Sequence, residues 1–316
     1  MKRKVFAGKI KRTLSKAVPL WVILVLIFYS SAGVGLIEYY IMKKNINALT
    51  LELSKKTRSP EELVQILKQE VLAQKGYTLG VVWSDIGKKL LESGAIDQKK
   101  YEDLFSSEPQ AKDYMKYLKN SSKDHMVINE KNSRFMVNTL WALGLVNKSP
   151  ILSEGEMKTY GNKDPMNYAS TGGWSLGSKP TSELYSSQEI VKLTLKQQEI
   201  VKKIAQNIYR PCCGNPTSFP DCNHGMAALG YIELAVKQGL SEKQIYKDVL
   251  ALNSFWFPQQ YVELAVYFDK QGAKWETIDA KKILAADYSS AQGMQKVRQQ
   301  VQNIPGFNTS GGGCAV

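Results

Sequence analysis

The longest stretch of hydrophobic positions without a charged residue lies near the N-terminus, over residues 17–37. An α-helix needs about 20 consecutive apolar residues to cross the hydrocarbon core of a bilayer. Aromatic side chains stand near both ends of the stretch, Trp21 near the first and Tyr39 with Tyr40 near the second, as is typical of membrane interfaces. The pattern predicts a single transmembrane anchor at residues 17–42.

Positive charge is concentrated before this stretch. Residues 1–16 contain seven basic residues and no acidic one, out of a net charge of +13 for the whole chain. Because basic segments stay on the cytoplasmic side, residues 1–16 are predicted to be a cytoplasmic tail, with the rest exported to the periplasm or cell exterior. A cleaved signal peptide ending near Ser30-Ser31-Ala32 is the alternative, but the apolar run continues past that site.

Hydrophobic positions at helical spacing follow a polar connector at residues 43–58. Ser59 and Pro60 are typical of a helix start, and the helical pattern then continues until Gly76. The apolar residues 77–83 predict either a strand or a buried crossing.

Two further helices are predicted to begin at Ser84 and Asp97, and residues 133–146 read as a buried helix. Together these segments predict a helical domain at residues 59–150. Residues 151–187 are rich in Gly and Ser, so they predict a long ordered loop region.

The C-terminal part, residues 188–304, is predicted to be a small antiparallel helix bundle. Helical spacing recurs in four segments, at residues 188–208, 224–238, 241–253 and 259–270. The loop PCCGNPTSFPDCNHG joins the first two segments, which places the cysteines at one end of the bundle. Residues 305–316 are predicted to be a flexible tail.

The fold class predicted from these patterns is mainly α, with one transmembrane helix and one or more exported helical domains. Hydrophobic residues make up 43% of the chain and charged residues 22%, which is ordinary for a globular protein. Apart from the N-terminal tail, basic residues are spread along the helices rather than clustered on one module. Nucleic acid is therefore not an expected partner, whereas the lipid bilayer and another exported or membrane protein are.

Three short motifs resemble the membrane-anchored thiol-disulfide domain of the cytochrome c maturation H family. They are Arg-Pro-Cys-Cys at residues 210–213, Asp-Cys-Asn at 221–223 and Gly-Leu-Ser-Glu-Lys-Gln-Ile at 239–245. In that family a Leu-Arg-Cys-x-x-Cys motif lies in the first loop of a three-helix bundle. The resemblance implies a bundle with a redox-active loop, in which Cys212 or Cys213 corresponds to a family cysteine.

The cysteines permit three kinds of chemistry. In an exported domain, four cysteines predict disulfides with three possible pairings, although the neighbours Cys212 and Cys213 would form a strained ring. Cys212, Cys213, Cys222 and His224 also satisfy the ligand count of a four-coordinate site for zinc or another soft metal. The same three thiols are the candidate catalytic residues for thiol-disulfide exchange, since Cys222 precedes a predicted helix N-terminus that favours its thiolate.

Cys314 lies three residues from the end of the chain, after three glycines. A flexible tail can carry it to the 212–224 loop, as a disulfide partner or a further metal ligand. The alternative is a disordered tail with an incidental thiol.

Two classes of function stay open. The first is a membrane-anchored extracytoplasmic protein with a Cys/His site for metal binding or thiol-disulfide exchange with a partner. The second is a non-catalytic structural or interaction module whose cysteines form stabilising disulfides. The sequence carries no Gly-Lys-Ser phosphate loop, Gly-x-Ser-x-Gly elbow or His-Glu-x-x-His pair. It therefore does not predict an enzyme, and the one enzyme class it admits is a thiol-disulfide oxidoreductase.

Overall fold

The computed structural model describes residues 35, 38–46, 49, 59–159 and 164–301. The chain divides into two units, Met1–Ser59 and Pro60–Val316, and the described residues of the first unit are helical apart from Ser59.

The transmembrane part of the predicted fold is corrected by the structure. Among the residues described, no helix combines the length and the apolar composition that a membrane crossing requires. The longest helices given for the second unit have 15 residues each, against the roughly 20 needed. The prediction of a single-pass membrane protein with an exported domain is therefore not upheld. The basic tail at 1–16 and most of the predicted anchor at 17–42 lie outside the described residues.

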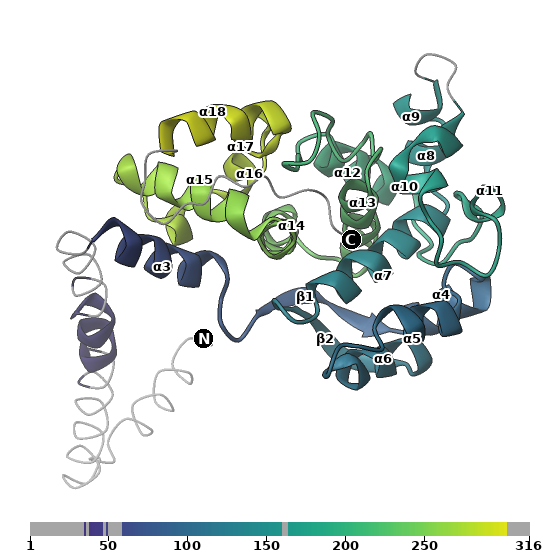
Figure 1. Ribbon diagram of the computed structural model, residues 1–316, viewed down its shortest axis with the longest axis horizontal. Coiled ribbons are helices and arrows are strands. Elements are labelled where there is room, and N and C mark those ends of the chain that lie inside the picture. The colour runs from purple at the N-terminus through teal and green to yellow at the C-terminus, as the bar shows by residue number, and fades with distance from the viewer. Residues whose placement is uncertain (1–34, 36–37, 47–48, 50–58, 160–163, 302–316) are drawn as a thin grey trace, which may run out of the picture. The chain divides into compact units, whose positions relative to one another are not determined.

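The mainly helical prediction is confirmed for the second unit (Figure 1), which also contains one small two-stranded sheet. Its first half consists of α3 (Pro60–Val71), β1 (Tyr77–Ser84), α4 (Ile86–Ser93), α5 (Gln98–Leu104), α6 (Ala111–Lys119), β2 (Ser122–Ile128) and α7 (Ser133–Val146). The short elements that follow in the described residues are α8 (Pro150–Ser153), α9 (Glu156–Thr159), η2 (Pro165–Asn167), α10 (Ala169–Gly172) and α11 (Thr181–Leu184).

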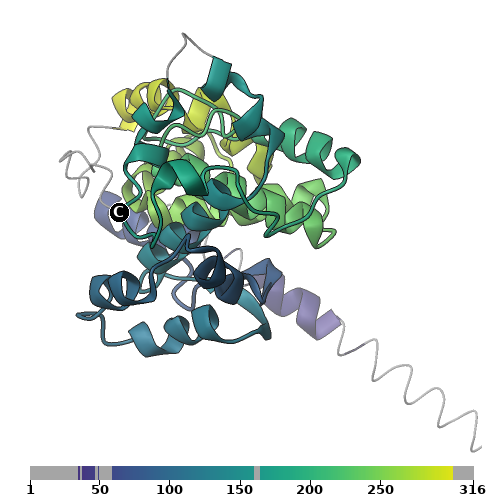
Figure 2. The ribbon, with the colours of Figure 1, turned by 90° about the vertical axis from the view of Figure 1, so that its right-hand side faces the viewer.

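The second half begins with four helices of 11–15 residues. They are α12 (Leu195–Ala205), α13 (Asn223–Lys237), α14 (Glu242–Trp256) and α15 (Pro258–Lys270). The chain then forms η3 (Trp275–Thr277), α16 (Ala280–Ile283), α17 (Ala286–Ser289) and α18 (Ala291–Val301). Both ribbon views place α4–α6 on one side of this unit and the C-terminal helices on the other (Figures 1 and 2).

Helix α13 lies at the centre of the unit and packs closely against α7. Two glycines allow this approach. A Cβ atom at Gly144 would lie 2.1 Å from the Met226 carbonyl oxygen, and one at Gly230 would lie 2.4 Å from the Leu140 carbonyl oxygen. Every residue from His224 to Val236 is buried. The regions predicted as separate domains, 59–150 and 188–304, therefore share one core.

The Asp248 carboxylate ties the sheet to the C-terminal helices. The backbone N–H of Gly80 donates to it over 2.9 Å, as does the Tyr77 hydroxyl, and the Gln244 amide donates over 2.7 Å. The Tyr231 hydroxyl on α13 is a further donor. Because these donors come from β1, α13 and α14, one buried carboxylate stabilises the contact between three elements.

Helix α12 begins later than the predicted helix at 188–208. Thr194 accepts a hydrogen bond from the Gln197 amide, and the Gln197 side chain accepts from the Thr194 amide, which forms a capping box. The residues before it are not helical, and Gln188 forms a bridge with Asn147 at the end of α7. The apolar residues Ile190 and Val191 are buried in this irregular segment rather than on a helix face.

Candidate metal and thiol site

The cysteine loop joins α12 to α13 and is held in place by backbone hydrogen bonds. The Tyr209 amide donates to the Leu284 carbonyl over 2.8 Å, and the Ala291 amide donates to the Cys213 carbonyl over 3.0 Å. Within the loop, the Thr217 amide donates to the Ile208 carbonyl over 2.8 Å. These bonds fix the loop against the C-terminal helices, so its side chains have defined positions.

Three predicted site residues bring their sulfur atoms together in this loop. The Sγ atoms of Cys212 and Cys222 are 3.2 Å apart, and those of Cys213 and Cys222 are 4.0 Å apart. The first distance is longer than the bond of about 2.05 Å in a disulfide. All three side chains are partly buried. The sulfurs form one cluster with Cys222 as its shared member.

Arg210 is fully buried beneath this cluster and makes four hydrogen bonds. Its Nε donates to Cys222 Sγ over 2.9 Å, and one terminal nitrogen donates to Asp221 Oδ1 over 2.7 Å. The remaining donors reach the carbonyls of Asn215 at 2.9 Å and Phe219 at 3.3 Å. A buried cation needs anionic partners, and here they are the Asp221 carboxylate and the Cys222 sulfur.

Cys222 is the N-cap residue of α13, and its sulfur accepts the Gly225 amide at 3.4 Å. Hydrogen bonds from the Cys212 and Cys213 thiols, together with the charge of Arg210, hold the pKa of Cys222 well below its usual value. Although a hydrogen bond with Cys212 opposes the change, hydrogen bonding to Cys222 and burial raise the pKa of Cys213 to about 12. The loop therefore stabilises one thiolate, at Cys222.

His224 occupies the first turn of α13 and is 4% exposed. Its ring packs against Phe257, with ring centroids 4.4 Å apart, and against Trp256 at 5.7 Å. Burial lowers the pKa of His224 to about 4, so the imidazole is neutral near pH 7. Its Nδ1 atom is buried and, within the described part of the chain, has no hydrogen-bond partner. A neutral imidazole with an unused nitrogen is the form that binds metal ions.

The predicted ligands fall into two overlapping sets. The ligand atoms of Cys212, Cys222 and His224 lie within 4.8 Å of one another, and so do those of Cys213, Asp221 and Cys222. Cys222 belongs to both sets, Cys212 and His224 belong to the first, and Cys213 belongs to the second together with Asp221, which was not predicted as a ligand. The fifth predicted ligand, Cys314, lies outside the described residues.

Sequence reasoning did not assign roles to Arg210 and Asp221. A signal was present, because Arg210 lies two residues before Cys212 and Asp221 directly precedes Cys222. A basic residue close to a cysteine is a known way to stabilise a thiolate. What the sequence does not indicate is that the arginine is buried and turned toward the second cysteine of the loop.

The sulfur and imidazole groups of this cluster are ligand types that bind zinc and other soft metal ions. For a tetrahedral zinc ion with Zn–S bonds of about 2.3 Å, neighbouring sulfurs are about 3.8 Å apart. The sulfur separations of 3.2 Å and 4.0 Å lie on either side of this value. Both separations therefore lie within about 0.6 Å of the value for sulfurs bound to one zinc ion.

Comparison with known proteins adds no evidence on the function of this cluster. The chain matches no protein-family model, no curated protein and no solved structure at a significant level. The resemblance of residues 210–245 to the cytochrome c maturation H family accordingly stays a prediction.

Proposed function

We propose that this protein binds a soft metal ion, of which zinc(II) is the simplest case, through Cys212, Cys222 and His224. The observation that supports this best is that a ring nitrogen of the buried His224 lies within 4.8 Å of the sulfurs of Cys212 and Cys222. A metal ion bonded to that nitrogen and to the two sulfurs joins the three side chains in one site.

The electrostatics of the loop support the same proposal. A cysteine must lose its proton to become a metal ligand, and the surroundings of Cys222 already favour the thiolate. Arg210 donates to the Cys222 sulfur and Asp221 orients Arg210. Such outer hydrogen bonds hold ligands in position at metal sites. Cys213, with its sulfur 4.0 Å from that of Cys222, is the nearest candidate for a fourth ligand.

Metal analysis of the reduced full-length chain tests this function. After incubation with zinc and gel filtration, we expect about one bound ion per chain. Cys222→Ser and His224→Gln should each reduce the bound zinc strongly. His125→Gln is the matched control, because His125 is the other histidine and lies on strand β2, outside the cysteine loop.

The same measurements can reject the proposal. If the reduced wild-type chain retains no zinc, cobalt(II) or copper(I), the site is not a metal centre. If His125→Gln lowers the zinc content as much as His224→Gln, the binding does not depend on the cluster. Melting curves of the variants separate loss of a ligand from loss of the fold.

Thiol-disulfide exchange is a second candidate, favoured by the 3.2 Å contact between the sulfurs of Cys212 and Cys222. The Cys222 thiolate attacks a disulfide of a partner protein, and the other partner sulfur leaves as a thiolate. Cys212 then loses its proton to solvent and attacks Cys222, which releases the second partner sulfur. The partner disulfide gains two electrons, and the Cys212–Cys222 pair loses two.

Oxidised glutathione serves as a probe for this second function. With metal-free wild-type protein, exchange should produce a Cys212–Cys222 disulfide that mass mapping detects. Cys212→Ser should instead accumulate a mixed disulfide on Cys222, whereas Cys213→Ser should still form the internal bond. A wild-type chain in which Cys222 is still a free thiol after incubation with oxidised glutathione excludes exchange. A Cys212–Cys222 bond that forms but cannot be reduced by thiols points to the structural alternative.

A further inference from the structure

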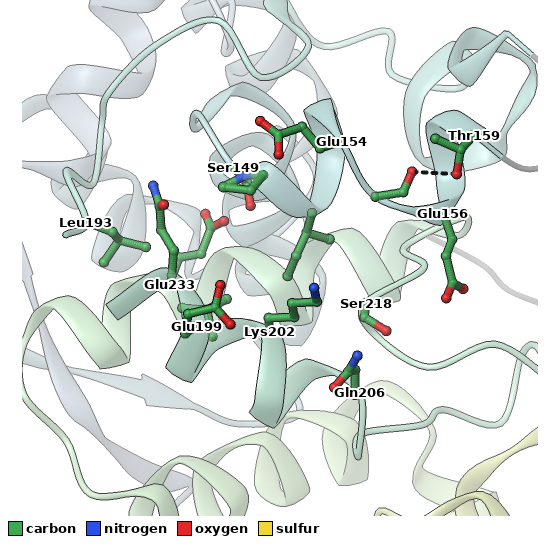
Figure 3. A pocket seen from close by; sticks show the side chains of 15 residues that line it. Ser149, Glu154, Glu156, Thr159, Leu193, Glu199, Lys202, Gln206, Ser218 and Glu233 are labelled. Atoms are coloured by element: carbon green, nitrogen blue, oxygen red, sulfur yellow. Dashed lines mark hydrogen bonds between the residues drawn. The ribbon is translucent and has the colours of Figure 1, made fainter. Parts of the chain in front are cut away.

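A second candidate site lies in a pocket that contains none of the cysteines. The pocket has a volume of about 400 Å³ and lies between the α8–α9 segment, α12 and one residue of α13 (Figure 3). Its side chains combine carboxylates with an apolar wall. The apolar side chains include Ile151, Leu193 and Val201, and the carboxylates are Glu154, Glu156, Glu199 and Glu233.

Glu233 differs from the other residues that line this pocket, because it comes from the buried helix α13. Its side chain has no exposed surface. One oxygen, Oε2, accepts a hydrogen bond from the Asn147 amide over 2.8 Å. The other oxygen, Oε1, is buried and has no hydrogen-bond partner among the residues that the structure describes. Burial raises the pKa of Glu233 to about 8, although the nearby side chains of Ser149 and Asn147 act in the opposite direction.

The rest of the pocket has an excess of negative charge. Figure 3 shows Glu154 and Glu156 on the α8–α9 side and Glu199 and Lys202 on the α12 side. These four side chains are exposed, so they stand at the mouth, while Glu233 is buried at the α13 side. The charged side chains at the mouth are thus three glutamates and one lysine, and Glu233 adds a fourth carboxyl group at the α13 side.

We propose that this pocket binds a small aliphatic polyamine or diamine, with one ammonium group hydrogen-bonded to Glu233. The ammonium supplies the donor that Oε1 lacks, and it neutralises the buried carboxylate. The methylene chain lies along Ile151, Leu193 and Val201, and a second ammonium group reaches the glutamates at the mouth. The proposal does not depend on the function assigned to the cysteine loop.

Two features favour an organic amine over other ligands. The excess of carboxylates excludes an anion, because no compensating cluster of cations lines the described pocket. A divalent metal ion prefers several oxygen ligands and retains water, whereas part of this pocket wall is aliphatic. An alkyl chain with a charge at each end matches both the apolar wall and the separated carboxylates.

Isothermal titration of the full-length protein with spermidine tests the proposal. Glu233→Gln keeps the size of the side chain and an acceptor for Asn147, but it cannot ionise, so it cannot pair with an ammonium group as a carboxylate does. We expect it to weaken spermidine binding at least about ten-fold, as expected when one partner of a buried charge pair is lost. Glu183→Gln is the matched control, since Glu183 is exposed on α11 and outside the pocket.

Proton release provides an independent readout. Near pH 7, Glu233 is mostly protonated in the free protein, so an ammonium ligand that pairs with it must displace a proton into the buffer. Titrations in buffers of different ionisation enthalpy should detect this proton for wild type and not for Glu233→Gln. Equal affinity for wild type and Glu233→Gln, or equal binding of uncharged 1,6-hexanediol, would overturn the proposal. If sodium or magnesium at equal charge concentration competes with spermidine equally well, the binding is non-specific cation screening, and the proposal is also rejected.

Discussion

Arg210 holds the cysteine loop through hydrogen bonds to four of its residues. Its guanidinium contacts Cys222, Asp221 and the carbonyls of Asn215 and Phe219. A Cβ atom on Gly225 would lie only 2.5 Å from the guanidinium carbon, so the first turn of α13 is shaped around this side chain. A planar five-donor group fits such a set of acceptors, whereas a lysine ammonium does not.

Replacement of Arg210 should therefore destabilise the fold strongly. We expect Arg210→Lys to lower the free energy of unfolding by about 3 kcal/mol or more, because it leaves buried acceptors without donors. Urea denaturation of the metal-free protein measures this change. The control is Arg134→Lys, since the Arg134 side chain is 42% exposed and lies 3.8 Å from Glu108. Exposed pairs contribute about 0–1 kcal/mol, so equal effects at both positions would contradict the role assigned to Arg210.

Glu233 makes stability dependent on pH in a known direction. Its pKa rises from 4.5 to about 8 on folding, so the folded chain binds this proton more tightly than the unfolded chain does. The resulting stabilisation is fully present below about pH 4.5 and is lost as pH rises through about 8. Glu233→Gln should flatten this part of the stability curve and stabilise the fold by about 1 kcal/mol or more at pH 8.5. Urea midpoints between pH 5 and 9 check this, with Glu183→Gln as the control that should leave the slope unchanged.

Helices with clear start and stop signals were predictable from local sequence. Gly239 has the left-handed φ of +80° that ends α13, and Ser241 caps α14 by accepting the Gln244 amide. Asp97 likewise caps α5. The prediction that Ser84 caps α4 was one residue early, because Ser84 ends β1 with a φ of 50° and Asp85 is the N-cap residue.

Other elements depend on contacts that local sequence does not contain. Strand β2 has three consecutive exposed residues, so it lacks the alternation of a half-buried strand. It is defined by its pairing with β1. The predicted start of the helix at 188–208 was wrong for a related reason, since Ile190 and Val191 are buried in an irregular segment that bridges to the end of α7. Hydrophobic periodicity indicates which residues are buried. It does not show whether they lie in a helix or in an irregular segment.

The contact between α7 and α13 should be intolerant of added volume. Gly144→Ala places a Cβ atom 2.1 Å from the Met226 carbonyl oxygen, which forces the helix backbones apart. We expect a loss of about 3 kcal/mol or more in unfolding free energy. Gly272→Ala is the comparison, because nothing lies near its Cβ position and only its φ of +76° is unfavourable. That strain costs roughly 1 kcal/mol. Equal losses for the two variants would show that the helix approach is not tight.

At the scale of the whole molecule, the Pro60–Val316 unit shares one hydrophobic core. The predicted bundle at 188–304 is one part of it, and α13 is covered by α7 from the other part. A fragment of residues 188–304 should therefore not fold cooperatively by itself, whereas residues 60–316 should. Near-ultraviolet circular dichroism and thermal melting of both fragments test this. A cooperative melt of the short fragment would show that the bundle is independent.

The cysteine and histidine residues of the candidate metal site were easier to identify from the sequence than Glu233 and its pocket. Cys212, Cys213, Cys222 and His224 lie within one loop and the helix that follows, so chain connectivity alone brings them close. Glu233 was missed, although a single carboxylate within the apolar helix α13 is a visible signal. Its pocket could not be predicted, because the other walls come from segments that are distant in sequence.

Helix α13 carries both candidate sites, with Cys222 and His224 at its start and Glu233 about 16 Å further along. Its residues from His224 to Val236 are enclosed on all sides, and amides in such a helix exchange with solvent deuterium only when the surrounding core opens. The two sites therefore share one opening event. A ligand that holds either end of α13 slows deuterium uptake along the whole helix, so occupancy of each site is reported in the exchange rates at the other.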